Sequence, residues 1–88
     1  MTPKELDIAF QNAVNSITNH VEPFPADVLL KLYAYYKHAT NDQNSPSSSN
    51  PLINAFKTNA LFQAQGLTPL EAKQKYIETV HQYFLYRK

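Results

Sequence analysis

The chain has 88 residues, which suits one domain near the lower size limit for a single hydrophobic core. It contains no cysteine, which excludes a disulfide-stapled scaffold and a thiolate metal site, and its formal net charge of +1 provides no global field for nucleic acid. With 43% hydrophobic residues, one glycine and few β-branched runs, the composition predicts a single all-α domain over residues 1–88.

The charges are divided unevenly along the chain. Residues 1–30 hold one lysine and four carboxylates, whereas residues 31–88 hold seven Lys or Arg and three carboxylates. Positive charge is therefore concentrated from the second predicted helix onward, where it permits a local anion site. No apolar run approaches the roughly 20 residues of a membrane span, and no signal-like segment is recognisable. We expect a soluble, cytoplasmic monomer without stable membrane insertion.

The first predicted helix begins at residues 2–5, Thr-Pro-Lys-Glu, which combine a capping box with a proline at the first helical position. We expect it to end near Thr18 or Asn19, because Pro23 and Pro25 favour extended backbone in the next segment. Its apolar side recurs at helical spacing and comprises Leu6, Phe10, Ala13, Val14, Ile17 and Val21.

The second predicted helix runs from Pro25 or Ala26 to Thr40 and gathers four unlike groups on one face. Two phenols, an ammonium and a hydroxyl fall at i, i+3, i+4 and i+7. Together they suit a ligand with a flat ring and a phosphate. The alternative is that the tyrosines pack in a core while the lysine extends along them to water. The four residues are Tyr33, Tyr36, Lys37 and Thr40.

Two more helices follow a polar connection at residues 41–49. Asn50 is a helix cap with Pro51 at the first helical position, and Gly66 is suited to the left-handed residue that ends the third helix. The fourth helix starts at Thr68 with a second Thr-Pro-x-Glu box and runs to the end of the chain. The pattern predicts four helices with one long connection between the second and the third.

The chain lacks the residue patterns of catalysis and of metal binding. Its histidines, His20, His38 and His81, lie on three different segments without the i, i+4 spacing of a helical metal site. No serine has the glycines of a nucleophile elbow, and the carboxylates are too scattered to form a general acid–base pair. We expect a protein that is not an enzyme and holds no metal or cofactor.

The second predicted helix contains the segment Leu32-Tyr33-Ala34-Tyr35-Tyr36-Lys37-His38-Ala39-Thr40. This segment resembles the Leu-Tyr-x-x-Tyr-Lys-Gln-Ala-Thr signature of the acyl-CoA-binding protein family. That family is a four-helix bundle of about this length with a long connection between helices two and three. The resemblance therefore extends over nearly the whole chain and implies the same fold.

The resemblance also implies a ligand site built from three helices. In the third helix, counting back without gaps from Gly66 places Lys57 on the family's ligand-binding lysine, whereas a shortened alignment would place Leu61 there. We prefer the first alignment because it preserves the length of the helix. The implied ligand-binding residues are Tyr33, Tyr36, Lys37, Lys57 and Tyr76.

By this resemblance the protein is an intracellular, non-catalytic carrier and buffer of long-chain fatty acyl-CoA. The adenine ring would stack on Tyr36, and the 3′-phosphate would bind Lys37 and Lys57. The acyl chain would gain about 0.8 kcal/mol per CH₂ in an apolar groove. Candidates to line that groove are Ala13, Val14 and Leu29.

The chain departs from the family pattern in its cations. Thr18 stands where the family often carries a basic residue, and the prolines and Phe24 remove another between the first two helices. His38 replaces the glutamine of the signature, a separate departure. Fewer cations around the phosphates lead us to expect weaker headgroup binding than in typical members. One alternative is a helical protein-interaction module that has lost or weakened the ligand. Another is a single-stranded nucleic-acid binder, against which the near-neutral charge argues.

Overall fold

The computed structural model describes residues 2–20, 24–41 and 50–86, and the regular structure in these ranges is helical throughout. The predicted all-α class and the four-helix bundle are confirmed. Most of the predicted connection, residues 42–49, lies outside the described ranges. Among the described helices, none combines the length and apolar composition needed to cross a membrane. The helices are α1 (Pro3–Thr18), α2 (Ala26–Ala39), α3 (Pro51–Gln63) and α4 (Pro69–Tyr86).

Side-chain caps fix the starts of three helices. Both bonds of the predicted capping box form at α4, where the Glu71 amide donates to Thr68 Oγ1 (3.1 Å) and the Thr68 amide donates to Glu71 Oε1 (3.0 Å). These bonds hold the pKa of the Glu71 carboxyl below its usual value. At α1, Thr2 accepts from the Glu5 amide, and at α3 Asn50 accepts from the Leu52 amide.

The turn between α3 and α4 uses the only glycine of the chain. Gly66 has φ of +90°, a conformation that side chains with a Cβ rarely adopt. The predicted left-handed role of this glycine is confirmed. The helix itself ends at Gln63 with Ala64 as the C-cap, so one residue, Gln65, lies between the cap and Gly66.

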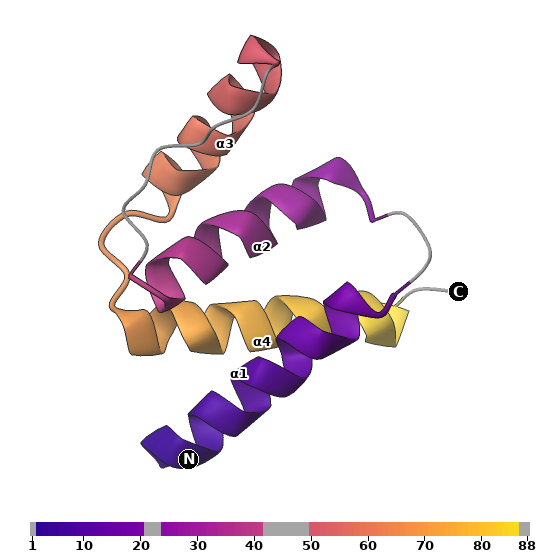
Figure 1. Ribbon diagram of the computed structural model, residues 1–88, viewed down its shortest axis with the longest axis vertical. Coiled ribbons are helices and arrows are strands. Elements are labelled where there is room, and N and C mark those ends of the chain that lie inside the picture. Colours follow the sequence, from indigo (N-terminus) through magenta and orange to yellow (C-terminus); the bar gives the residue numbers. More distant parts are fainter. Residues whose placement is uncertain (1, 21–23, 42–49, 87–88) are drawn as a thin grey trace.

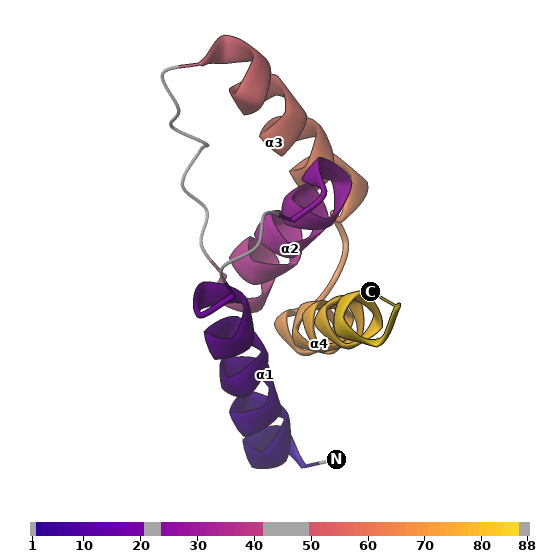
Figure 2. The same cartoon turned by 90° about the vertical axis from the view of Figure 1, so that its right-hand side faces the viewer.

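Helix α4 is the central element of the fold. It packs against both α1 and α2, which lie on the same side of it in Figure 2 (see also Figure 1). Helix α3 packs against α2 alone and projects away from the other two helices (Figure 1). The molecule therefore consists of a three-helix core with α3 attached to the outer side of α2.

The hydrophobic core lies between α1, α2 and α4. Ala72 of α4 is completely buried, and its small side chain permits the neighbouring helices to approach closely. An ion pair between Lys73 of α4 and Asp7 of α1 spans the edge of this interface. No residue of α3 is buried. The buried core cluster comprises Phe10, Ala13, Leu32, Ala39, Ala72, Tyr76 and Val80.

Two leucines of α2 test this arrangement. Leu32 is only 4% exposed, whereas Leu29 is 46% exposed. The Leu32→Ala variant should lose about 2–5 kcal/mol of unfolding free energy, because it leaves a cavity in the core. The matched Leu29→Ala variant should change it by no more than about 0.5 kcal/mol. Urea unfolding measures both, and equal losses would contradict the burial described above.

Candidate functional site

Two lysines from different helices converge on the ring of Tyr33. The Lys37 Nζ lies 5.6 Å from the ring centroid, and the Lys57 Nζ lies 5.1 Å from it. Lys37 and Tyr33 share one face of α2, while Lys57 reaches the ring from α3. Both ammonium groups are within the range of cation–π attraction, and that attraction holds two like charges in one neighbourhood. The arrangement favours an anion between them.

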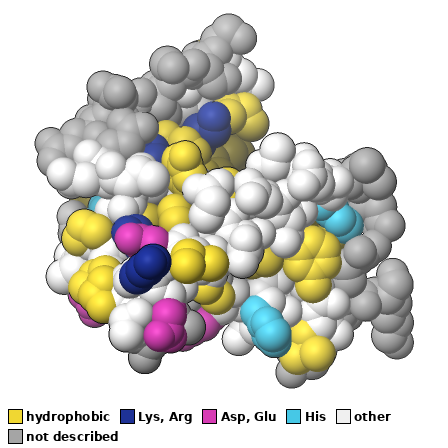
Figure 3. Space-filling view, turned by 60° about the horizontal axis from the view of Figure 1, so that its bottom comes forward, with side chains coloured by type: hydrophobic (Ala, Val, Ile, Leu, Met, Phe, Trp, Pro, Cys, Tyr) yellow, Lys and Arg dark blue, Asp and Glu magenta, His cyan; other side chains and the backbone are white. Residues whose placement is uncertain are grey.

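Burial strengthens the positive potential at this point. The Lys37 side chain is 7% exposed and is the only buried charged residue among those the structure describes. Lys57 is half-buried. Because charges interact more strongly away from water, a phosphate bound here would gain more than it would at surface lysines. The face in Figure 3 shows Lys or Arg and hydrophobic side chains together in its upper, hollowed part.

A second group at the site is an aromatic cluster built from three helices. Tyr36 of α2 lies nearly parallel to Phe10 of α1, with ring centroids 6.0 Å apart and planes inclined by 24°. Tyr76 of α4 meets Phe10 edge-on at 5.1 Å and lies 6.3 Å from Tyr36. Tyr36 is 43% exposed, so part of its ring is free to contact a ligand, whereas Phe10 and Tyr76 are buried.

The hydroxyl of Tyr76 is held in its protonated form. Burial, together with the neighbouring Tyr36, raises the pKa of Tyr76 to about 12. A phenol that remains protonated can donate a hydrogen bond to an anion or a carbonyl throughout the physiological range. Tyr76 is thus suited both to packing beneath Tyr36 and to donating at the base of the site.

Two neighbouring polar residues of the signature segment contact the protein itself. The Thr40 hydroxyl donates to the Tyr36 carbonyl at 2.8 Å, so this member of the predicted face caps its own helix. His38 Nε2 lies 3.4 Å from the Leu61 carbonyl of α3. These contacts stabilise the end of α2 and its junction with α3.

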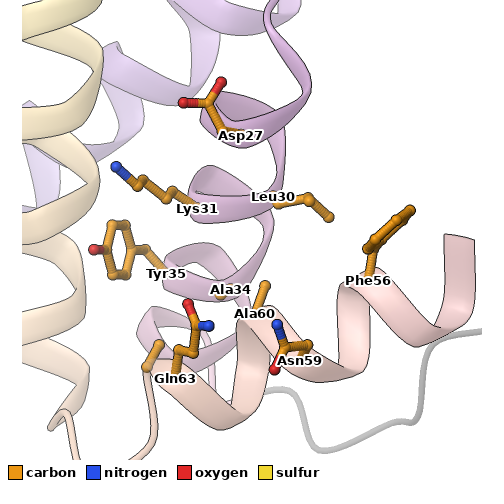
Figure 4. Close-up of a pocket in the computed structure, with 10 residues that line it drawn as sticks. Asp27, Leu30, Lys31, Ala34, Tyr35, Phe56, Asn59, Ala60 and Gln63 are labelled. Carbon is orange, nitrogen blue, oxygen red and sulfur yellow. The ribbon is translucent and has the colours of Figure 1, made fainter.

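A groove of about 300 Å³ separates α2 from α3 beyond the lysines. In Figure 4, Leu30 of α2 points toward Phe56 of α3, while Lys31 and Tyr35 point toward α4. Leu30 is one helical turn from Tyr33, and Phe56 directly precedes Lys57, so the groove begins close to the cationic site. The remaining lining residues are Asp27, Ala34, Asn59, Ala60, Gln63 and Ala64.

The five predicted ligand-binding residues fall into two adjoining groups, one around Tyr33 and one around Tyr36. The three predicted groove residues are dispersed. Ala13 is buried against α4 and Val14 packs partly against the core, whereas Leu29 is exposed on α2. Ala13 lines a different groove, between α1 and α4. The ligand role of these residues stays a prediction.

Phe10 is part of the cluster but was not predicted to be a site residue. In the sequence it belongs to the apolar side of the first helix, and nothing distinguishes it there from a core phenylalanine. Its contact with Tyr36 depends on how α1 is rotated against α4. Spacing within one helix does not carry that information.

The comparison with protein families gives one match. Residues 7–80 match the family model described as Acyl CoA binding protein, and this span includes the lysines at Tyr33 and the cluster around Tyr36. Searches of the curated proteins and of the solved structures gave no significant match.

The shifted pKa of Tyr76 predicts a loss of stability at high pH. The pKa of Tyr76 is about 12 in the folded chain and 10.0 ordinarily. The protonated Tyr76 hydroxyl therefore contributes fully to the unfolding free energy below pH 10.0, and this contribution is lost as the pH rises toward about 12. The difference in tyrosinate absorbance between wild type and Tyr76→Phe should therefore develop near pH 12. Ionisation at pH 10.0 in that difference would contradict the burial of the hydroxyl.

Proposed function

Since the chain belongs to the acyl-CoA-binding protein family, we propose that it binds long-chain fatty acyl-CoA esters and carries or buffers them in the cytoplasm. The family is a non-catalytic binding domain, and the thioester would be held and not cleaved. The observation that carries the proposal is the pair of lysines at Tyr33, which come from two helices and lie within the matched span.

The nucleotide part of the ligand would use the two adjoining groups. The 3′-phosphate would lie between Lys37 and Lys57, where charge-assisted hydrogen bonds are strong. The adenine would stack on the exposed part of Tyr36, a contact worth roughly 1–3 kcal/mol by analogy with other bases on aromatic rings. Tyr76 would support Tyr36 from below through their ring contact.

The acyl chain needs apolar surface near the lysines. Leu29 of α2 and Leu52 and Ile53 of α3 are exposed, and Phe56 lines the groove between these two helices. A fatty chain lying along them would remove this apolar surface from water and gain about 0.8 kcal/mol for each CH₂ it buries. The bound acyl chain would contact both helices, so α3 would be held to α2 more firmly in the complex than in the free protein.

A second candidate is a protein-interaction module with weak or absent ligand binding. The exposed apolar residues of α3, among them Leu52, Phe56 and Phe62, favour it, because such a surface is suited to a protein partner as well as to a fatty chain. Thr18, which stands where the family often carries a basic residue, favours it too.

Calorimetric titration separates these candidates. We expect palmitoyl-CoA to bind with a dissociation constant below about 1 μM. Free CoA should bind far more weakly, and a single-stranded oligonucleotide should give no heat of binding. The acyl chain, which free CoA lacks, supplies the difference in affinity between palmitoyl-CoA and free CoA. Absence of palmitoyl-CoA binding in a folded protein would reject the carrier function and leave the interaction module.

Substitutions in the site should weaken palmitoyl-CoA binding without unfolding the protein. Tyr36→Ala removes the stacking ring, and Lys57→Ala removes one phosphate partner, so each should cost at least about tenfold in affinity. The exposed Lys4 of α1 provides the control, and Lys4→Ala should bind as wild type does. If Lys57→Ala and Lys4→Ala bind equally well, the phosphate lies elsewhere.

A further inference from the structure

Helix α3 carries one of the two lysines of the site but is weakly attached to the protein. Among the described helices it packs against α2 alone, and it contributes no buried residue. The Nζ of Lys57 nevertheless lies 5.1 Å from the ring centroid of Tyr33 on α2. Holding a lysine side chain in one place costs conformational entropy, and it requires that the helix bearing the lysine stays fixed against its neighbour. The site therefore depends on whatever fixes α3 along α2.

His38 makes a polar contact between these two helices. Its Nε2 lies 3.4 Å from the carbonyl oxygen of Leu61, and the contact is partly buried. Because a carbonyl only accepts, a hydrogen bond here requires a proton on Nε2, which one neutral tautomer and the imidazolium both carry. Leu61 follows Lys57 by one helical turn, and His38 directly follows Lys37. Along both helices, the contact is thus close to a lysine of the site.

The Leu61 carbonyl belongs to the last turn of α3, where a helix leaves carbonyl groups without an intrahelical donor. The Ala64 amide donates to the carbonyl of Ala60 at 3.1 Å. The Gln65 amide donates to the carbonyl of Phe62 at 3.2 Å, so these two bonds pass over the carbonyl that lies between them. A side-chain donor from α2 can satisfy that carbonyl, and in doing so it fixes where α3 ends against α2.

We propose that His38 is a positioning residue: by holding the end of α3 to α2, it keeps Lys57 beside Tyr33. The other lysine does not depend on this contact, because Lys37 is on the same helix as Tyr33. The effect of His38 on ligand affinity rests on the proposed acyl-CoA binding, whereas its effect on the position of Lys57 does not. A glutamine amide can also donate to the Leu61 carbonyl, so His38→Gln should retain the role.

Nuclear Overhauser contacts in the ligand-free protein test the position of Lys57. Wild type should show contacts between the Lys57 methylene protons and the Tyr33 ring protons, because the ammonium lies beside that ring. These contacts should be lost in His38→Ala and retained in His38→Gln. His81→Ala, which replaces an exposed histidine of α4, is the matched control and should retain them. Contacts that persist unchanged in His38→Ala would overturn the proposal.

A double-mutant cycle with palmitoyl-CoA tests whether His38 acts through Lys57. His38→Ala alone should weaken binding by about three- to tenfold, and His38→Gln should restore it. In the Lys57→Ala background, His38→Ala should cost less than about twofold, since the lysine that it positions is already absent. His81→Ala should bind as wild type does. Equal losses from His38→Ala in both backgrounds would reject the positioning role.

The wild-type protein provides a check that needs no substitution. Nitrogen NMR of the His38 imidazole should find a proton on Nε2, and an unprotonated Nε2 would overturn the proposal even if His38→Ala failed to fold. If folded wild type does not bind palmitoyl-CoA, acyl-CoA binding fails, while the Overhauser contacts still decide the position of Lys57. If palmitoyl-CoA binds and those contacts survive His38→Ala, the carrier function stands and the positioning role is rejected.

Discussion

The contact on which both core and site depend is the meeting of three rings from three helices. Tyr76 of α4 packs against Phe10 of α1 and Tyr36 of α2, so the packing that holds the core together also orients the exposed ring of the site. Tyr36 therefore cannot tilt independently of the interface between α1 and α4. A stacking surface supported by buried aromatic rings is preorganised, and little conformational entropy remains to be lost when a flat ligand binds.

The cationic half of the site is built differently. Lys57 belongs to a helix without buried residues, and it approaches Tyr33 across the junction of α3 with α2. The ring attracts both lysines while the lysines repel each other, so an anion placed between them would reduce that repulsion. The candidate site thus combines a rigid aromatic surface with a cation whose position depends on a weakly attached helix.

Much of the fold could be predicted from short-range signals. The caps at Thr68 and Asn50 and the positive φ of Gly66 follow from local chemistry, which is the same in any fold that has these helices. The grouping of Tyr33 with Lys37 followed from helical spacing, whereas Lys57 was implied only by the resemblance to the family, through an alignment counted back from Gly66. The participation of Phe10 and the groove between Leu30 and Phe56 were not predictable, because both depend on how helices rotate against one another.

The attachment of α3 to α2 alone has a consequence for how the protein can change over generations. Substitutions on α3 disturb no buried contact, so they should carry little penalty in folding stability. The residues that shape the groove from that side, Phe56 and Asn59 among them, are thus free to vary independently of the core. Ligand preference can then change without a compensating mutation in the core. In a bundle whose third helix contributed buried residues, the same substitutions would also change folding stability.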